Sequence, residues 1–349
     1  MARKVAARTL QNHYGPIMAK PFDSKAVNGA DLAASLRAGD RRALARAITL
    51  VESTRPQDQA EAEALLTALL PATGGAVRIG ISGAPGVGKS TFIEAFGGHL
   101  TGQGRCVAVF AIDPSSRRSG GSILGDKTRM EKLSRDPLAY IRPSPAGTTL
   151  GGVARRTRES LLLAEAAAFD VVLVETVGVG QSETAVADMT DLFVLLASPG
   201  GGDDLQGIKR GVMELADLLI VTKADGDLLP AAHRAASDYQ AAMHLMRPKH
   251  AGLYPKVMKV SALAGIGIED AWAEIAAIHG SLAADGRLAR LRTEQSRRWF
   301  WSEVQSALSE AILTDPTLAT GAAQLEEAVA TGQSLPYTAA RTLLRSFRS

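Results

Sequence analysis

Six short apolar runs, most of them separated by segments of helical length, constrain the fold of this chain more than any other feature. The runs are rich in β-branched residues and do not alternate with polar ones, which is typical of strands buried on both faces of a parallel sheet. They span 77–82, 106–112, 171–175, 192–197, 218–222 and 257–260. We therefore predict an α/β fold with a doubly wound, mostly parallel sheet.

Helical patterns lie on both sides of this region. Asp40 stands in the N-cap position of an apolar stripe formed by Leu44, Ile48 and Val51. After about residue 282, a second stripe with i+4 spacing includes Phe300, Val304, Leu308 and Ile312. A stripe of this kind must be covered by its own domain or by a second copy of the chain, and the pattern leaves both open. We assign a flexible tail to 1–22, a helical domain to 23–75, the sheet domain to 76–281 and a helical arm to 282–349.

Composition excludes several classes of function. The 39 Lys+Arg and 36 Asp+Glu give a net charge of +3, too small an excess to favour nucleic acid or an anionic membrane as the main partner. Cys106 is the only cysteine, so no intramolecular disulfide and no CxxC pair can form. No apolar run approaches the roughly 18 residues that span a bilayer. We expect a cytoplasmic protein with no nucleic-acid or membrane partner. Residues 1–22 are basic and poor in acids, so the mitochondrial matrix is the alternative if they form a transit peptide.

A phosphate-binding motif directly follows the first predicted strand. It matches GxxxxGK[ST] in full and consists of Gly83, Ala84, Pro85, Gly86, Val87, Gly88, Lys89 and Ser90, with Thr91 beginning the next helical run. Glycines let backbone N–H groups turn toward phosphates, and a helix N-terminus adds positive potential. We expect Lys89 to reach the β/γ-phosphate oxygens and the Ser90 hydroxyl to ligate Mg²⁺. A nucleotide kinase would use the same loop.

Two later segments favour guanine. Thr222, Lys223 and Asp225 form a [NT]KxD pattern at the end of a predicted strand, and Ser261, Ala262 and Leu263 follow the next one. A carboxylate at Asp225 can accept hydrogen bonds from N1–H and N2–H₂ of guanine, a pair of donors that adenine lacks. Each motif alone is weak, since TKxD also occurs in solvated turns. Their order behind the phosphate-binding loop predicts GTP.

Acidic, glycine-rich segments follow three of the predicted strands. Asp113 and Asp126 bracket a Gly/Ser-rich loop, the composition of a segment that Mg²⁺ orders and that hydrolysis releases. Glu175 ends an apolar strand as the acid of a Walker B segment, and Gly178 follows where a backbone amide can sense the γ-phosphate. A third loop contains Lys209.

The strings DPSS, SGGSILGDKTRM, VETVGVGQSE and DDLQGIKRG resemble those of the MeaB/ArgK-type P-loop GTPases. That family chaperones adenosylcobalamin-dependent methylmalonyl-CoA mutase, and the resemblance covers roughly residues 31–310. It implies a GTPase domain of the signal-recognition and MinD-like (SIMIBI) class, with an N-terminal helical extension and a C-terminal dimerisation arm. It further implies GTP/GDP and Mg²⁺ as cofactors, the mutase as partner and a homodimer.

The resemblance also assigns roles to individual residues. It implies that Asp113, Asp126 and Glu175 lie around Mg²⁺ and the γ-phosphate, that Ser90 ligates the metal, and that Lys209 belongs to the third switch. We expect Lys89, Asp113, Glu175 and Lys209 to act in catalysis. Val179, not a glutamine, follows Gly178, so we predict slow intrinsic hydrolysis that accelerates when Lys209 or Arg210 enters the site. The competing interpretation is that both cations only pair with Asp203 and Asp204.

We therefore predict a GTP-hydrolysing chaperone that gates adenosylcobalamin loading and protects or reactivates the mutase. One alternative is a P-loop kinase that acts on a transport-related protein, although no acceptor site or base is recognisable. The other is a metal-delivery GTPase, although six scattered histidines and one cysteine form no cluster.

Overall fold

The computed structural model describes residues 29–112, 130–142, 150–176, 182–199 and 210–347. Its centre is one sheet of seven strands in the order β3-β2-β4-β1-β5-β6-β7, and every neighbouring pair is parallel. The strands are β1 Val77–Gly83, β2 Val107–Ile112, β3 Ala139–Arg142, β4 Val171–Thr176, β5 Leu192–Ala197, β6 Leu218–Val221 and β7 Lys256–Lys259. The six predicted strands are all present, and the predicted α/β class with a parallel sheet is confirmed.

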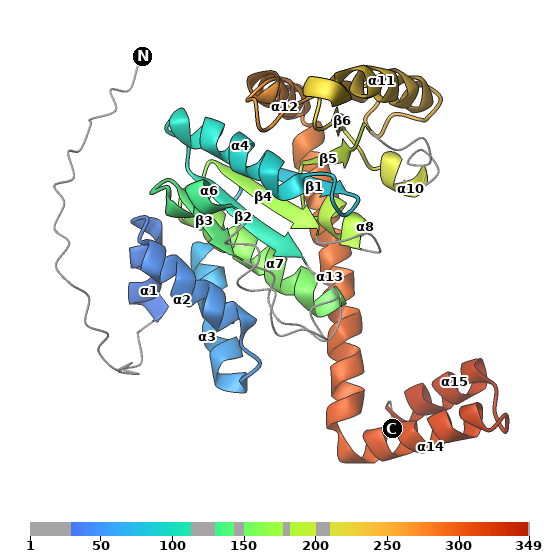
Figure 1. The fold of residues 1–349 in the computed structure, drawn as a ribbon. Helices are drawn as coiled ribbons and strands as arrows, with labels where there is room; N and C mark the ends of the chain where they lie inside the picture. Colours follow the sequence, from blue (N-terminus) through green and yellow to red (C-terminus); the bar gives the residue numbers. More distant parts are fainter. Residues whose placement is uncertain (1–28, 113–129, 143–149, 177–181, 200–209, 348–349) are drawn as a thin grey trace.

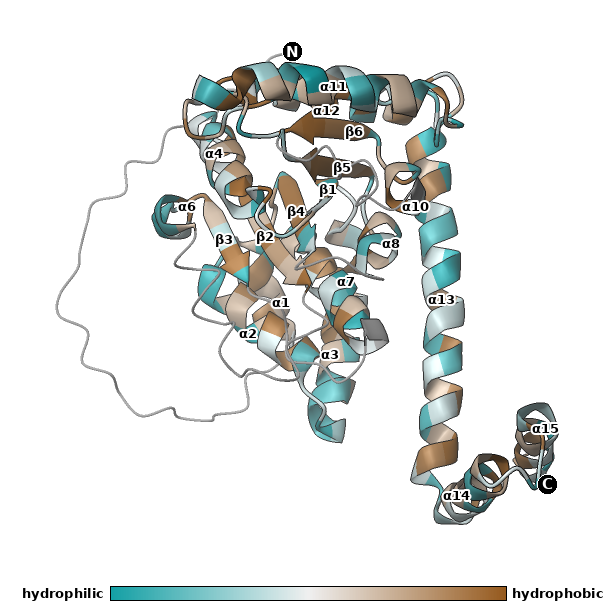
Figure 2. Cartoon of the chain, turned by 45° about the vertical axis from the view of Figure 1, so that its right-hand side comes forward, coloured by the Kyte–Doolittle hydropathy of each residue, from teal (hydrophilic) through white to brown (hydrophobic). Residues whose placement is uncertain are grey.

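The sheet is covered on both faces, which explains why its strands are apolar throughout. Figure 2 shows the strands as the most hydrophobic part of the chain. In β4, Val172 and Val174 point into one core and Val171 and Leu173 into the other. Helices α4 Lys89–Gly102, α6 Glu131–Arg135 and α12 Ile268–Ala284 cover one face. Helices α7 Leu150–Ala166, α8 Ser182–Ala187, α10 Arg210–Met213 and α11 Leu229–His244 belong to the other.

Strand β3 is the one strand in the described ranges that the sequence did not predict. It pairs only with β2 and has four residues, of which Ala139 is fully buried and the other three are half-buried. A strand this short that ends in Arg142 forms no continuous apolar run, so it lacks the pattern on which the other strands were identified. The remaining signal is Tyr140–Ile141 between two nearby prolines, at positions 137 and 143.

Three N-terminal helices lie against α7, on the far side of that helix from the sheet (Figure 1). They are α1 Gly29–Arg37, α2 Arg41–Glu52 and α3 Pro56–Leu69. The Asp40 carboxylate accepts hydrogen bonds from the N–H groups of Arg42 and Ala43, so the predicted N-cap of α2 is confirmed. A 3₁₀ turn, Leu70–Ala72, follows α3 and leads into β1.

The C-terminal helices leave the body of the molecule. Helix α13, Arg287–Thr314, begins beside the sheet and its second half projects outward to α14 Pro316–Ala330 and α15 Pro336–Ser346 (Figure 1). The expected boundary after residue 281 falls inside α12, where Leu282 is fully buried in the core. The helix break at Asp285–Gly286 separates α12 from α13. Among the described residues, no helix combines the length and the apolar character that a bilayer requires.

Candidate functional site

The carboxyl ends of three central strands bring the predicted phosphate and metal segments together. Strand β4 lies between β1 and β2, so Glu175 is level with Ile81 of β1 and with Ala111 of β2. Ile112, which immediately precedes Asp113, is level with Thr176. Ligands of open parallel sheets bind at this edge, and three of the predicted loops begin there.

The phosphate-binding loop connects β1 to α4 and depends on its glycines. Gly86 and Gly88 have φ angles of 78° and 99°, a region that favours residues without a Cβ atom. A Cβ atom on Gly83 would lie 2.6 Å from the carbonyl oxygen of Leu196, so β5 approaches the loop too closely for any other residue. The loop therefore packs against the sheet and ends at the N-terminus of a 14-residue helix.

Lys89 and Ser90 occupy the first turn of α4. The Lys89 ammonium donates to the carbonyl oxygens of Gly83 at 2.8 Å and Ala84 at 3.3 Å, so this cation lies back across the loop. Ser90 is half-buried, whereas Thr91 is exposed. An ammonium group held across such a loop, at the N-terminus of a helix, makes a site for a polyphosphate anion.

Glu175 is buried at the end of β4, with 5% of its surface exposed. Beside it, the Thr176 hydroxyl donates to the Ser82 hydroxyl at 2.8 Å, and both side chains are fully buried. This bond joins the last residues of β4 to the strand that enters the phosphate-binding loop. The end of β4 and the start of the phosphate-binding loop are therefore held in a fixed position relative to each other.

The [NT]KxD segment lies directly on the phosphate-binding loop. The Thr222 hydroxyl is 2.6 Å from the carbonyl oxygen of Val87 and 3.1 Å from that of Ala197. The ammonium of Lys223 donates to the carbonyl oxygen of Gly86 at 2.8 Å. Lys223 has φ of 53°, which is uncommon for a residue with a side chain and marks a locally constrained turn.

The two segments predicted to recognise the base also meet. The Ser261 hydroxyl donates to the Asp225 carboxylate, and the Ala224 N–H donates to the carbonyl oxygen of Val260 at 3.1 Å. Ser261 is buried, Ala262 is half-buried and Leu263 is 87% exposed. Asp225 thus lies between the phosphate-binding loop and the 261–263 turn, its carboxylate oriented by a buried hydroxyl.

Several predicted site residues lie outside the described residues. These are Asp113, Asp126, Gly178 and Lys209. Two of them directly adjoin described elements: Asp113 follows β2 and Lys209 precedes α10. Within the described ranges, no three His, Cys, Asp or Glu side chains group closely enough to hold a metal ion.

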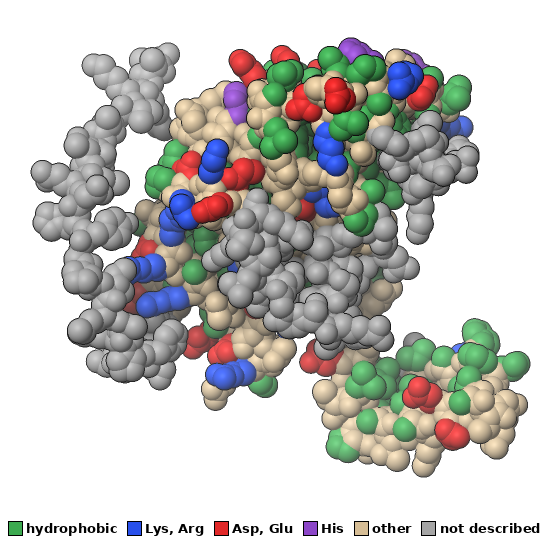
Figure 3. All heavy atoms as spheres, in the orientation of Figure 1, with side chains coloured by type: hydrophobic (Ala, Val, Ile, Leu, Met, Phe, Trp, Pro, Cys, Tyr) green, Lys and Arg blue, Asp and Glu red, His purple; other side chains and the backbone are tan. Residues whose placement is uncertain are grey.

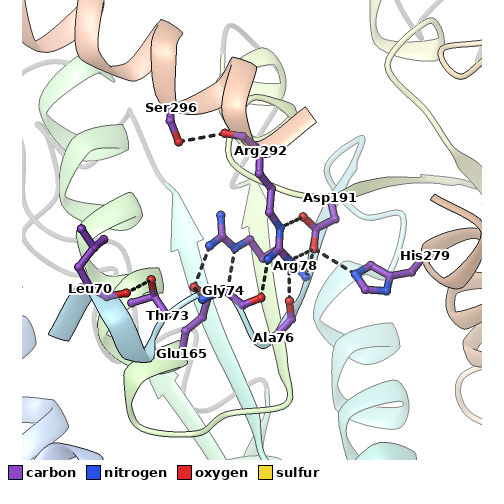
Figure 4. A network of polar contacts seen from close by, with 10 residues as sticks. All are labelled: Leu70, Thr73, Gly74, Ala76, Arg78, Glu165, Asp191, His279, Arg292 and Ser296. Atoms are coloured by element: carbon purple, nitrogen blue, oxygen red, sulfur yellow. Dashed lines mark hydrogen bonds and ion pairs between the residues drawn. The ribbon is translucent and has the colours of Figure 1, made fainter. Parts of the chain in front are cut away.

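A polar network at the opposite edge of the sheet was not predicted from the sequence (Figure 4). Arg292 of α13 forms a bidentate pair with Asp191 at 2.8 and 2.7 Å, and Arg78 forms one with Glu165 at 2.8 and 2.7 Å. Arg292 also donates to the carbonyl oxygens of Gly74 and Ala76. The 73–76 segment, which leads into β1, is therefore held by side chains of α7 and α13.

The electrostatics of this network are unusual at Asp191. Burial by itself raises the pKa of this carboxyl group. Hydrogen bonds from Arg292, His279 and the Arg78 N–H outweigh burial and lower the pKa of Asp191 from 3.8 to about 2. Such partners lie about a hundred residues apart in the chain, so no local sequence pattern reveals them.

Comparison with known proteins agrees with this geometry. The family model described as "Methylmalonyl Co-A mutase-associated GTPase MeaB" matches residues 44–317, well over half of the chain. The chain belongs to this family. The predicted resemblance is therefore confirmed.

This MeaB-family chain has relatives with several different names. It is 55% identical over 313 residues to a "Putative GTPase" of Caulobacter vibrioides, covering 89% of this chain and 95% of the relative. It is 48% identical over 324 residues to the "Methylmalonic aciduria type A homolog, mitochondrial" of Mus musculus, covering 89% of this chain and 77% of the relative. The solved "LAO/AO transport system kinase" has a TM-score of 0.74 and 38% identity, covering 93% of this chain and all of that one.

These findings establish the activity. The protein is a P-loop GTPase and binds guanine nucleotides. Its family is associated with methylmalonyl-CoA mutase.

Proposed function

We propose that this GTPase is a chaperone that gates adenosylcobalamin loading of methylmalonyl-CoA mutase and protects or reactivates that enzyme. The observation that carries the proposal is the convergence of the phosphate-binding loop, Glu175 and the two base segments in a chain that belongs to the mutase-associated GTPases. The mouse relative is named for methylmalonic aciduria, which supports the same partner.

The nucleotide and metal roles follow from the chemistry of the residues. Backbone N–H groups of 83–90, the Lys89 ammonium and the Gly178 amide bind the phosphates in this proposal. Mg²⁺ prefers hard oxygen ligands, and the Ser90 hydroxyl with the Glu175, Asp113 and Asp126 carboxylates supplies such a set. When bound, the metal neutralises charge that develops on the β- and γ-phosphate oxygens.

Base selection rests on Asp225 in the same proposal. Its carboxylate accepts N1–H and N2–H₂ of guanine, and the Ser261 hydroxyl holds it in that orientation. The Lys223 stem packs over the base, Thr222 fixes the segment to the phosphate-binding loop, and the 261–263 turn offers an N–H to the guanine oxygen.

Hydrolysis times the action of the chaperone. The chain orients water poorly without a glutamine after Gly178, so intrinsic turnover is slow until Lys209, or its neighbour Arg210, enters with its positive charge. The mutase then engages one nucleotide state more tightly than the other by a few kcal/mol, and linkage makes the effect reciprocal.

A homodimer completes the proposal. The arm formed by the outer half of α13, α14 and α15 exposes large apolar side chains, seen as green patches in Figure 3. They include Phe300, Trp301, Leu313, Leu335 and Tyr337, each at least 60% exposed. A second copy of the arm would cover them. We place the protein in the cytoplasm, or in the mitochondrial matrix if 1–22 act as a transit peptide.

A cofactor-transfer assay tests the function. Purified mutase apoenzyme is mixed with adenosylcobalamin and the full chain, in the presence of GDP or a non-hydrolysable GTP analogue, and mutase turnover is followed. We expect loading of the holoenzyme to depend on the nucleotide, and Lys89→Ala to remove this dependence. Equal mutase affinity for both nucleotide states would contradict gating.

The two alternatives remain testable in the same preparation. A solved structure similar to this chain is titled a transport system kinase, so transfer of labelled γ-phosphate to protein rather than to water would favour that activity. Stoichiometric Ni²⁺ or Zn²⁺ on the purified protein would favour metal delivery.

A further inference from the structure

A cavity of about 200 Å³ lies where α13 leaves the body of the molecule, between the segment after α3, helix α7, the turn after α8 and α13. It is on the opposite edge of the sheet from the phosphate-binding loop, beside the Arg78–Glu165 and Arg292–Asp191 pairs of Figure 4. Much of its wall is apolar, formed by Leu70, Leu161, Leu162, Met189 and the Trp299 ring. A cavity of this size accommodates several water-sized groups.

One buried acceptor in this wall has no donor. The amide nitrogen of Gln295 donates to the carbonyl oxygen of Thr190 at 2.7 Å, which fixes the orientation of the amide. Its Oε1 is buried and accepts no hydrogen bond within the part of the chain that the structure describes, while Gln295 as a whole is 6% exposed. An unsatisfied buried acceptor costs about 1–3 kcal/mol, so a donor in the cavity would stabilise the site.

One cation in the wall lacks a carboxylate. Arg78 pairs with Glu165, Arg292 with Asp191, and Asp188 with Arg298. Arg158 has no ion-pair partner among the described residues, and its guanidinium lies 5.8 Å from the centre of the Trp299 ring. Glu303 accepts a hydrogen bond from Trp299 Nε1 at 2.8 Å and pairs with Arg155.

The electrostatics of Arg158 set it apart from its neighbours. In Arg142, Arg155 and Arg292, burial lowers the pKa, but a bonded carboxylate outweighs burial and the pKa is raised. In Arg158, burial outweighs the attraction of the Asp188 and Glu303 carboxylates, neither of which is bonded to it, and the pKa is lowered. Among the described arginines that line the cavity, Arg158 is therefore the one with no directly bonded carboxylate.

We propose that this cavity binds a small monocarboxylate that also carries a hydroxyl or amine donor. The carboxylate pairs with the Arg158 guanidinium, which presents two parallel N–H groups to such a ligand. The donor bonds to Gln295 Oε1, and the short apolar body of the ligand lies against Trp299 and Leu162. This site is independent of the proposed mutase function.

Occupancy would connect the arm to the GTPase domain. The ligand would contact α7 through Arg158 and α13 through Gln295 and Trp299, in addition to the Arg155–Glu303 ion pair that already joins these helices. A ligand that binds only the folded state also stabilises it by mass action. The thermal midpoint of the full chain therefore gives a second readout besides binding.

The test uses 3,3,3-trifluorolactate as the probe, observed by fluorine NMR with full-length protein. Saturating GDP and Mg²⁺ occupy the phosphate-binding loop, so an anion at that loop is excluded as the source of a signal. We expect saturable broadening of the probe resonance and a rise in the thermal midpoint. The neutral amide of the same acid should bind about tenfold more weakly or worse, because it lacks the charge that pairs with Arg158.

Variants identify the site. Arg158→Leu should weaken probe binding about tenfold or more, and Leu162→Trp, which fills the cavity and keeps the arginine, should abolish it. Arg156→Leu is the matched control, since Arg156 is on the same helix but lines a different groove, and it should leave binding unchanged. Undiminished binding in Leu162→Trp, or no binding by the wild type at millimolar probe, would overturn the proposal and leave a cavity that holds water only.

Discussion

Thr222 joins two parts of the candidate nucleotide site through one hydroxyl group. Asparagine is the commoner residue at this position of the [NT]KxD pattern, so threonine is the weaker match to it. In the structure its hydroxyl is 2.6 Å from a carbonyl oxygen of the phosphate-binding loop. The threonine hydroxyl therefore donates to the phosphate-binding loop, and an asparagine amide is not needed for this hydrogen bond.

We predict that Thr222→Val lowers GDP affinity about fivefold to tenfold, because the buried carbonyl of Val87 loses its donor while the volume of the side chain is kept. Thr222→Ser keeps the hydroxyl and should bind GDP nearly as the wild type does. Calorimetric titration with GDP and Mg²⁺ measures both. Equal losses in the valine and serine variants would contradict a role for the hydroxyl.

Asp225 gives a sharper prediction about the base. Asp225→Asn presents an amide to N1–H and N2–H₂ of guanine, so one donor faces another and GDP affinity should fall at least about a hundredfold. Xanthine has a carbonyl group in place of the guanine amino group, so the same variant should bind xanthosine diphosphate better than GDP. Competition between the two nucleotides in one titration measures the switch, and Asp227→Asn, an exposed acid two residues later, is the control.

At the scale of elements, the Arg292–Asp191 pair fixes α13 to the amino edge of the sheet. Both side chains are largely buried, with 19% of the arginine and none of the aspartate exposed. Breaking a buried pair by removal of one partner leaves an uncompensated charge and costs about 3–5 kcal/mol. Arg292 also donates to Gly74 and Ala76, so the segment between α3 and β1 depends on the same guanidinium.

This pair predicts a specific dependence of stability on pH. Asp191 has a pKa of about 2 in the folded protein instead of 3.8, a difference that corresponds to about 2 kcal/mol of the free energy of unfolding. Because the pKa is depressed on folding, the contribution is complete above about pH 4 and is lost as the pH falls toward 2. Denaturant unfolding of the wild type and Asp191→Asn between pH 3 and 7 should therefore show a smaller stability gap at pH 3.

The control for that experiment is Asp285→Asn. Asp285 pairs with Arg287 on the surface, and hydrogen bonds from Arg287 lower the pKa of Asp285 without burial. Solvent screens such a pair, so its loss should change stability little at any pH. A stability gap for Asp191→Asn that stays constant from pH 7 to pH 3 would show that the ion pair makes no pH-dependent contribution.

Some of these elements could be predicted from the sequence and others could not. The buried strands and the phosphate-binding loop are local patterns, so six strands, the α2 cap and the loop context were predictable. Strand β3 was missed because four residues at a sheet edge, three of them only half-buried, carry almost no pattern. The Asp191–Arg292 contact was missed because its partners are 101 residues apart and neither belongs to a motif.

The same distinction holds for the candidate site. Lys89, Thr222, Lys223, Asp225 and Ser261 were identified from motifs, and the structure brings their segments together. The bond between Ser82 and Thr176 was not predicted, because a serine and a threonine within apolar strands have no spacing that distinguishes them from ordinary strand residues. Roles for Asp113, Asp126, Gly178 and Lys209 remain predictions of the resemblance.

At the scale of the whole molecule, the candidate nucleotide site and the root of the arm lie at opposite edges of one sheet. Helix α8 follows residues 177–181, which include Gly178, the candidate γ-phosphate sensor. Helix α13 contacts the end of α8 and the turn after it. Gln295 donates to the carbonyl oxygen of Thr190, and Arg298 pairs with Asp188 at 2.5 Å. The turn after α8 is thus bonded directly to α13, the helix from which the arm extends.

The last prediction concerns the tip of the arm, the turn between α14 and α15 with its exposed apolar side chains. We predict that this tip forms the dimer contact. Leu335 and Tyr337 are each 72% exposed near the turn between α14 and α15. Burial of one such side chain contributes about 1.5–3 kcal/mol, so the double variant Leu335→Glu with Tyr337→Glu should weaken dimerisation at least about a hundredfold. Sedimentation velocity over a concentration series measures this, with GDP affinity as the test that the GTPase domain is intact.

The matched control for the tip is Gln324→Glu with Gln333→Glu, which adds the same two negative charges at exposed positions of α14 and the following turn. We expect this control to dimerise as the wild type does, because it removes no apolar surface. If both double variants dissociate equally, the effect comes from charge repulsion and the apolar side chains are not the contact. If neither dissociates, the second copy covers another face and the exposed tip serves a different partner.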